Sequence, residues 1–276
     1  MKKVDRLGWA AGLSLKSYGV RIGIRSNEQA GLDRALSHLP HQHELVNLPV
    51  VDRLYSIIIG GEGPRANVRR FSLLYADHVR IARSVDAEEI FERLESDLRL
   101  FVAEVARHRV FVHAGVVGWK GKAIVIPGRS FTGKSTLVSE LVRAGASYYS
   151  DEYAVFDSQG RVHPFPKPLE MRNSGASKQT KVGVETFGGR TATKPIPVGL
   201  VMVTEYKAGA HWRPRALSGG KAVLSLLANT VSARRQPEKA LDAFQRVVAM
   251  AQTLKGVRGE AAQLAGSILA KMEKNT

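Results

Sequence analysis

The chain contains no cysteine, which excludes disulfides, thiolate-bound metals and a cysteine nucleophile. It also lacks an apolar run near the roughly 18 residues that a membrane span needs. The apolar stretch 7–15 is short for a secretory signal, follows Asp5 and lacks a clear small-residue cleavage site. We therefore expect a cytoplasmic protein without a membrane span.

Acidic residues are scarce, because 25 Asp and Glu stand against 41 Lys and Arg, a formal net charge of +16. This balance favours an acidic partner, such as a peptide, a protein or a nucleic acid. The positive charges are spread from Lys2 to Lys274, with no long basic block and no interleaved aromatic residues. That distribution disfavours nucleic acid. Histidines do not cluster at metal-ligand spacing either.

A complete phosphate-binding motif, G-x-x-x-x-G-K-[ST], is present. Its eight positions, followed by Thr136, are Gly128, Arg129, Ser130, Phe131, Thr132, Gly133, Lys134 and Ser135. The glycines allow backbone N–H groups to turn toward an anion, and the N-terminus of a following helix adds positive potential. The lysine reaches the outer phosphates and the serine hydroxyl holds magnesium. The motif therefore predicts a site for ATP and Mg²⁺.

The flanking sequence favours the strand–loop–helix context that this motif requires. Residues 122–126 are typical of a buried strand, and apolar residues recur at helical spacing from Leu137 to Val142, before a C-capping Gly145. Residues 109–117 predict an antiparallel hairpin with 122–126. A further strand is expected over 146–157, with Asp151 and Glu152 near its middle.

Residues 1–108 indicate a smaller mixed α/β module. We expect strands at 18–24, 54–59 and 68–83, and a helix capped by Asn27 that runs to about Leu39. A longer bridging helix begins at Asp86, which forms a capping box with Glu89. Its apolar stripe comprises Ile90, Phe91, Leu94, Leu98, Phe101, Val102 and Val105.

Residues 109–276 are expected to form the nucleotide-binding domain. Residues 173–195 have little apolar periodicity, which indicates either a loop that closes over a site or a surface insertion. A strand at 197–204 and helices at about 220–231, 237–254 and 260–271 follow. Residues 217–220 match the start of a transporter-ATPase signature, but their position favours a helix start. Arg234 and Arg235, between two helices, are either an arginine finger or a solvated charge pair.

The order of these motifs resembles the HPr serine kinase/phosphorylase family and its wider relatives, including kinases of lasso-peptide precursors. A strand carrying His113 precedes the loop, and Ser150-Asp151-Glu152 follows its helix. Residues 170–172, Glu-Met-Arg, partly match a second signature, although Asn173 replaces its glycine. Glu152 replaces the second of two aspartates. The C-terminal signature and the regulatory domain of the HPr enzyme are not evident, so HPr is not the favoured substrate.

The resemblance implies an α/β fold with a P-loop kinase core of the HPr kinase/PEP carboxykinase type, and it suggests a homo-oligomer. Asp151 would be the general base, His113 would orient that base or tune its pKa, and Lys134 would draw charge from the transferring phosphoryl group. Ser135, Glu152 and Glu170 would hold magnesium. From the residues alone, His113 could equally be a hydrogen-bonded core residue, Asp151 a magnesium ligand, and Glu170 part of a solvated pair.

The expected activity is ATP- and magnesium-dependent phosphorylation of a serine hydroxyl on a peptide or small protein. The scattered positive charge gives only weak support for an acidic acceptor. Two alternatives stay open. One is a catalytically weak, ATP-binding regulatory protein, and the other is a kinase of a small hydroxyl metabolite.

Overall fold

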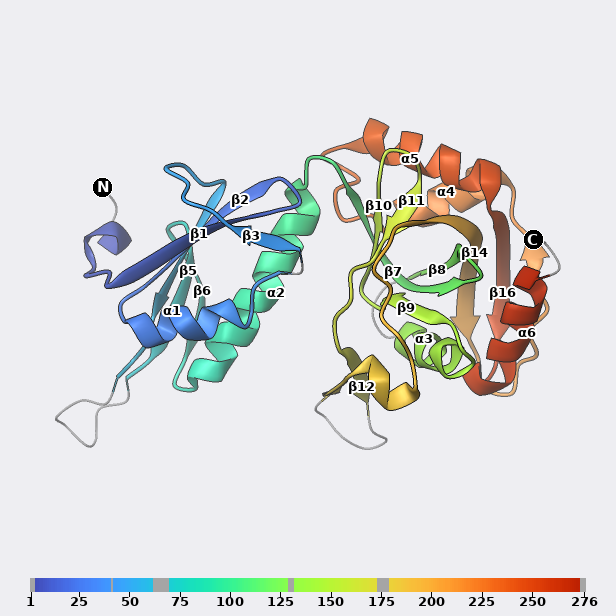
Figure 1. Ribbon diagram of the computed structural model, residues 1–276, viewed down its shortest axis with the longest axis horizontal. Coiled ribbons are helices and arrows are strands. Elements are labelled where there is room, and N and C mark those ends of the chain that lie inside the picture. The colour runs from blue at the N-terminus through green and yellow to red at the C-terminus, as the bar shows by residue number, and fades with distance from the viewer. Residues whose placement is uncertain (1–2, 41, 62–69, 129–131, 173–178, 274–276) are drawn as a thin grey trace. The chain divides into compact units, whose positions relative to one another are not determined.

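The computed structural model describes residues 3–40, 42–61, 70–128, 132–172 and 179–273 (Figure 1). The chain divides into two compact units, Met1–Arg107 and His108–Thr276. Each unit combines helices with its own mixed β-sheet, so the protein is a mixed α/β protein. In the described ranges, none of the helices combines the length and the apolar character that crossing a membrane requires.

The N-terminal unit is built on a six-stranded sheet with the order β3-β1-β2-β4-β5-β6. Only the β2–β4 pair is parallel. The strands are β1 (Ala11–Ser17), β2 (Val20–Ser26), β3 (His43–Leu45), β4 (Arg53–Ile58), β5 (Ser72–Ala76) and β6 (Val79–Ser84). The helices are the 3-10 helix η1 (Lys3–Arg6), α1 (Gln29–Leu36) and α2 (Ala87–Val105).

Several local predictions in this unit are wrong. Tyr18 and Gly19 have positive φ angles of 48° and 83° and form the β1–β2 turn, so the predicted strand begins only at Val20. Asn27 does not cap α1, whose N-cap is Glu28. Its side-chain amide instead accepts from the N–H of Ile59 at 2.8 Å and donates to the carbonyl of that residue at 3.2 Å. The side chain of Asn27, predicted to cap the helix, therefore hydrogen-bonds the backbone of Ile59 on a neighbouring segment instead. The strand predicted over 68–83 is instead a hairpin of β5 and β6 that turns at Asp77, with a φ of 53°; residues 68–69 lie outside the described residues.

Helix α2 begins as predicted, with Asp86 as the N-cap accepting from the N–H of Glu88 at 2.9 Å. The capping box is incomplete, because Glu89 accepts from the Ser84 hydroxyl at 2.6 Å. The predicted apolar stripe is buried from Ile90 to Val102. This burial follows from the helical spacing of the apolar residues.

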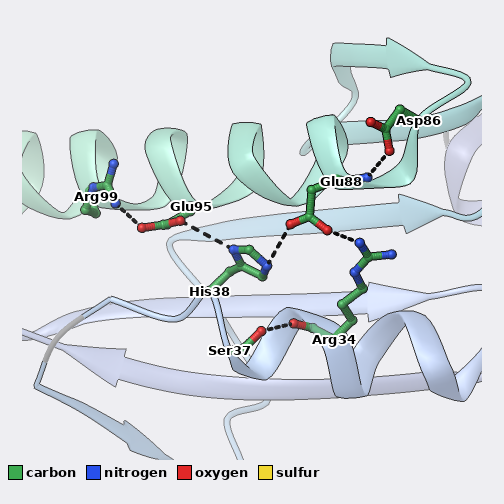
Figure 2. A network of polar contacts seen from close by, with 7 residues as sticks. All are labelled: Arg34, Ser37, His38, Asp86, Glu88, Glu95 and Arg99. Carbon is green, nitrogen blue, oxygen red and sulfur yellow. Dashed lines mark hydrogen bonds and ion pairs between the residues drawn. The ribbon is translucent and has the colours of Figure 1, made fainter. Parts of the chain in front are cut away.

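Figure 2 shows how polar contacts join α1 and α2 within this unit. Glu88 on α2 pairs with Arg34 and with His38, which follows α1. Glu95, two turns further along α2, pairs with His38 and with Arg99. A single histidine thus lies between two carboxylates of the neighbouring helix.

The C-terminal unit contains an eight-stranded sheet with the order β11-β10-β7-β8-β14-β16-β15, and β9 pairs with β7. The β8–β14 and β14–β16 pairs are parallel. The strands are β7 (Val110–Trp119), β8 (Lys122–Pro127), β9 (Ser147–Ser150), β10 (Tyr153–Phe156), β11 (Arg161–His163), β14 (Ile196–Tyr206), β15 (Arg215–Ala216) and β16 (Gln252–Arg258). A separate two-stranded sheet pairs β12 (Leu169–Arg172) with β13 (Gln179–Val182).

Helices cover both faces of the larger sheet (Figure 1). One face packs on α3 (Lys134–Arg143) and α6 (Ala261–Glu273), and the other on α4 (Gly219–Leu227) and α5 (Pro237–Met250). Alternate residues of β8 supply the two cores, because Ile124 and Ile126 face the first pair of helices while Ala123 and Val125 face the second. A strand covered on both sides is apolar, as this one is from Ala123 to Pro127.

Several predictions around the phosphate motif are confirmed. The β7–β8 hairpin turns at Lys120 and Gly121, with φ angles of 45° and 77°. Helix α3 ends at Arg143, and Gly145 closes its C-terminus: the Gly145 N–H donates to the Val142 carbonyl at 2.9 Å, and the next N–H donates to the Leu141 carbonyl at 3.1 Å. These two bonds form the glycine C-cap known as the Schellman motif.

Other predictions in this unit are wrong. The helix predicted over 237–254 ends at Met250, and the strand β16 follows it, because pairing with β14 and β15 overrides the helical pattern. The helix predicted over 220–231 ends at Leu227. Of the segment 173–195, residues 173–178 lie outside the described residues, whereas the remainder contains β13 and the 3-10 helix η2 (Val184–Phe187).

Candidate functional site

The phosphate-binding motif lies between β8 and α3. Gly133 is the N-cap of α3 and has a φ of +76°, a left-handed conformation that glycine adopts without strain. Lys134 is the first residue of the helix, and Thr136 is exposed. Arg129, Ser130 and Phe131 lie outside the described residues. At the start of the loop, the N–H of Gly128 donates to the carbonyl of His113 at 3.0 Å.

The two acids lie at a bend and not inside one continuous strand, which corrects the prediction for 146–157. The hydroxyl of Ser150 accepts from the N–H groups of Glu152 at 3.1 Å and Tyr153 at 3.0 Å, and so replaces ladder bonds at the bend. Strands β9 and β10 both pair with β7. The N–H of Ala114 on β7 donates to the carbonyl of Glu152 at 3.2 Å. The acids therefore lie beside the strand that carries His113.

Electrostatic effects link the predicted catalytic side chains. Burial lowers the pKa of the Lys134 ammonium, and the charge of Asp151 opposes this shift. Burial also lowers the pKa of His113; Glu152 opposes the change and Lys134 adds to it. Since Coulomb interactions weaken with distance, the fold has brought these four groups together from three separate segments.

Asp151 is only 8 % exposed. The hydroxyl of Tyr148 approaches its Oδ1 at 3.3 Å, but the same hydroxyl lies 2.8 Å from the carbonyl of Lys167. A hydroxyl has one proton, so the shorter bond takes it and the contact with Asp151 is the weaker one. The carboxylate of Asp151 thus lies in a low-dielectric position.

Glu152 contacts a lysine that the sequence analysis did not single out. Its Oε2 lies 3.0 Å from Nζ of Lys167, an ion pair that does not have hydrogen-bond geometry. Lys167 lies between two prolines, and nothing in the local sequence indicates its partner. The Glu152–Lys167 ion pair therefore depends on the tertiary fold and could not be predicted from the local sequence.

His113 is held mainly through its backbone, whose N–H donates to the carbonyl of Asn229 at 2.8 Å. Its ring lies 4.9 Å from the ring of Tyr153 at an interplanar angle of 40°. Within the described ranges, no residue hydrogen-bonds the imidazole. The residue therefore joins the start of the phosphate loop to the segment after α4 and leaves its ring nitrogens for other contacts.

The three predicted magnesium ligands come from three separate segments of the C-terminal unit. Ser135 lies in the first turn of α3, and Glu170 lies on β12 in register with Lys181. The side chain of Glu170 lies outside the described residues. Among the side chains that are described, no three His, Asp or Glu residues gather as metal ligands. Arg234 and Arg235 are both exposed between α4 and α5.

The sequence analysis missed Arg258, the last residue of β16. Its side chain is 2 % exposed, and Nη2 donates to the carbonyl of Gly133 at 2.9 Å. A Cβ atom added to Gly133 would lie 2.6 Å from this Nη2, so the loop and the guanidinium are in close contact. Nη1 donates to Gly259 at 3.1 Å, while the buried Nε has no hydrogen-bond partner. Burial lowers the pKa of Arg258, and Glu260 and Tyr206 oppose that shift.

The burial of Arg258 could have been predicted from alternation along a strand at 252–258. Residues 254, 256 and 258 share one side of β16, and Leu254 on that side is buried. Assigning the segment to a helix hid this alternation.

The C-terminal unit is a mixed α/β unit in which Gly133 and Lys134 of the glycine–lysine motif lie at the N-terminus of a helix. No protein-family model matches the chain, and no curated protein matches it.

Proposed function

We propose that this protein is an ATP- and magnesium-dependent kinase of the HPr kinase/PEP carboxykinase type that phosphorylates a serine hydroxyl on a peptide or small protein. One observation carries the proposal: a complete phosphate-binding sequence at the N-terminus of α3, with the Lys134 ammonium close enough to Asp151 for the two charges to interact. A loop of this kind alone occurs in many nucleotide-binding proteins. The adjacent buried carboxylate is what favours transfer to a hydroxyl.

The residues present fit a nucleoside triphosphate. Three positive groups meet at the loop: the N-terminus of α3, Lys134 and the buried Arg258. Burial disfavours the charged forms of Lys134 and Arg258. A bound anion would stabilise those charged forms and would itself be attracted to them and to the helix N-terminus. Ser135 and Glu152 would supply hard oxygen ligands for magnesium, with Glu170 as a third by resemblance.

In the proposed reaction, Asp151 accepts the proton of the serine hydroxyl as the hydroxyl oxygen bonds to the γ-phosphorus of ATP. The bond from that phosphorus to its bridging oxygen breaks, and ADP carries away the electron pair. Lys134 stabilises the charge that develops on the transferring phosphoryl group, and magnesium would neutralise part of it. Burial lowers the pKa of His113, which favours its neutral form, and His113 orients the carboxylate side of the site.

The test is transfer of radiolabelled γ-phosphate from ATP with magnesium, into the peptides and small proteins encoded beside this gene. Lys134→Ala should abolish nucleotide binding or turnover. Asp151→Asn should retain ATP affinity and lower the transfer rate by about 100-fold or more, the usual contribution of a general base. Asp242→Asn, an exposed aspartate on α5, is the matched control and should change neither quantity.

Unchanged transfer by Asp151→Asn would refute its assignment as the base. Tight ATP binding without label on any acceptor would favour a nucleotide-binding regulator. Label on small hydroxyl compounds but not on polypeptides would favour a metabolite kinase.

A further inference from the structure

A second feature of the C-terminal unit is a cavity of about 790 Å³, bounded by the ends of β14 and β16, by β15 and by the start of α4. We call it the basic cavity. Four cationic side chains and a histidine line it, with a single acid: Arg213, Arg215, Lys221, Lys255, His211 and Glu205. The volume falls within the range of ligand pockets and far exceeds the space that one inorganic anion fills.

The cations of the basic cavity are not neutralised by the protein. Throughout the described ranges, no carboxylate forms an ion pair with any of the four Lys and Arg side chains, and all four are exposed. Four cations beside a single acid leave the cavity with a net positive charge, which raises the electrostatic free energy of the folded chain. An anionic ligand would relieve this repulsion.

The start of α4 adds to the positive potential. Lys221 lies in the first turn of this helix, and Ser218, the N-cap, makes no side-chain capping bond. The backbone N–H groups of the first turn therefore have no capping oxygen, and the positive end of the helix faces the same cavity.

The basic cavity lies at the same edge of the sheet as the phosphate loop. Strands β8, β14 and β16 are parallel, so their carboxyl ends meet at one edge, where ligands bind in α/β sheets. The loop follows β8, and the cavity is lined by the last residues of the other two strands. Val257 lines the cavity, and its neighbour Arg258 donates to the loop carbonyl of Gly133.

We infer that the basic cavity binds an acidic segment of the polypeptide phosphoacceptor, and so sets the substrate class of the proposed kinase; this inference rests on the function proposed above. Its cations come from β15, α4, β16 and the β14–β15 connection, and Arg215 and Lys255 are paired residues of neighbouring strands. Cations that line the cavity from several elements suit several carboxylates along an extended chain. In addition, β15 is the last strand in the order of the sheet, and β16 is its only strand partner among the described residues. A free strand edge can pair with an extended peptide.

Nucleic acid fits the basic cavity less well than an acidic peptide. No Phe, Tyr or Trp lines it, so the large aromatic platforms that stack single-stranded bases are absent from its lining residues. Binding of an oligonucleotide is therefore a competing outcome of the test and not the proposal.

The experiment measures fluorescence anisotropy of a short fluorescein-labelled peptide of alternating Glu and Ser, with the full chain and no nucleotide. Arg213→Glu/Lys221→Glu reverses two charges of the cavity at exposed positions. Arg93→Glu/Arg246→Glu makes the same change of net charge at exposed positions on α2 and α5. We expect the cavity variant to weaken binding about tenfold or more and the control variant to leave it within about twofold. A Gln–Ser peptide should bind at least about tenfold more weakly than the Glu–Ser peptide.

Equal weakening by both variants, or equal affinity for the two peptides, would overturn the inference, because the effect would then be one of net charge or of backbone alone. Tighter binding of single-stranded RNA than of peptide through the same two residues would also overturn it. Circular dichroism of each variant shows whether it is folded; should the double variant unfold, Arg213→Ser alone replaces it.

Failure of the proposed function gives a different result. Lys134→Ala should retain peptide affinity, since the assay contains no nucleotide. Cavity-dependent peptide binding without any phosphoryl transfer would refute the kinase and leave the inferred binding site. Transfer in which the cavity variant leaves KM for the acidic peptide unchanged would support the kinase and refute the binding site. A rise in KM with unchanged kcat supports both.

Discussion

Replacing Arg258 by methionine should destabilise the C-terminal unit and loosen the phosphate loop. The methionine side chain fills a similar space but has no donor for the carbonyls of Gly133 and Gly259, which the guanidinium contacts at 2.9 Å and 3.1 Å. The carbonyl of Gly133 also accepts the first helical bond of α3, from Leu137 at 3.1 Å. Loss of Arg258 therefore acts where the loop becomes the helix.

Two charge-assisted hydrogen bonds contribute about 1.5–3 kcal/mol each, or roughly 3–6 kcal/mol in total. The third contact, from Nη2 to Thr132 at 3.5 Å, is too long to count. Removing a buried cation returns part of this free energy, because burial lowers the pKa of Arg258 and its Nε has no partner. We expect a net loss of about 2–4 kcal/mol, which at a urea m-value of about 2–3 kcal/mol/M lowers the midpoint by roughly 1 M.

Urea unfolding followed by circular dichroism measures this loss, and hydrogen exchange of the amides from Lys134 to Leu137 reports on the loop–helix junction. Arg246→Met, at an exposed position on α5, is the control and should stay within about 0.5 kcal/mol of the unaltered protein. An unchanged urea midpoint together with unchanged amide protection in Arg258→Met would refute the role of Arg258 in holding the loop.

Two further predictions concern the same unit. Burial lowers the pKa of His113, so its NMR titration midpoint should lie below about 6.5; Glu152→Gln should lower the midpoint further and Lys134→Met should raise it. Because the unfolded chain binds the imidazole proton at a higher pH than the folded chain does, protonation of His113 should lower the stability of the fold as the pH falls below about 6.5. Midpoints that shift in the opposite directions in these two variants would contradict the placement of the charges. Gly145→Ala should cost about 1–2 kcal/mol in urea unfolding because its φ is +103°, whereas Gly266→Ala on the exposed side of α6 should stabilise by about 0.5–1 kcal/mol; equal effects would exclude backbone strain as the cause.

The candidate site was partly readable before the fold was known, because a few of its features depend on local chemistry. The spacing of two glycines and a lysine defines the loop, and helical spacing of apolar residues up to Gly145 defines the helix behind it. Burial of that helix follows from its apolar face alone. The helix appears where the residues predict it.

Errors arose where partners distant in sequence decide the local conformation. Residues 252–258 follow a helix without a strong break, and only pairing with β14 and β15 makes them a strand. Asn27 has the right chemistry for a helix cap, but the backbone of Ile59 takes its side chain. Ser150 bends the chain at the two acids by binding the next N–H groups, a choice that a strand pattern does not reveal.

The sequence by itself determined the phosphate loop, the helix that presents it and the surplus of positive charge, since each depends on residue type and short-range spacing. Only the tertiary structure decided which charges meet. It placed Asp151 near Lys134, paired Lys167 with Glu152, and put the buried Arg258 against a carbonyl 125 residues earlier in the chain. The physical reason is that parallel strands bring their carboxyl ends to one edge of a sheet, and no local pattern specifies which strands those are.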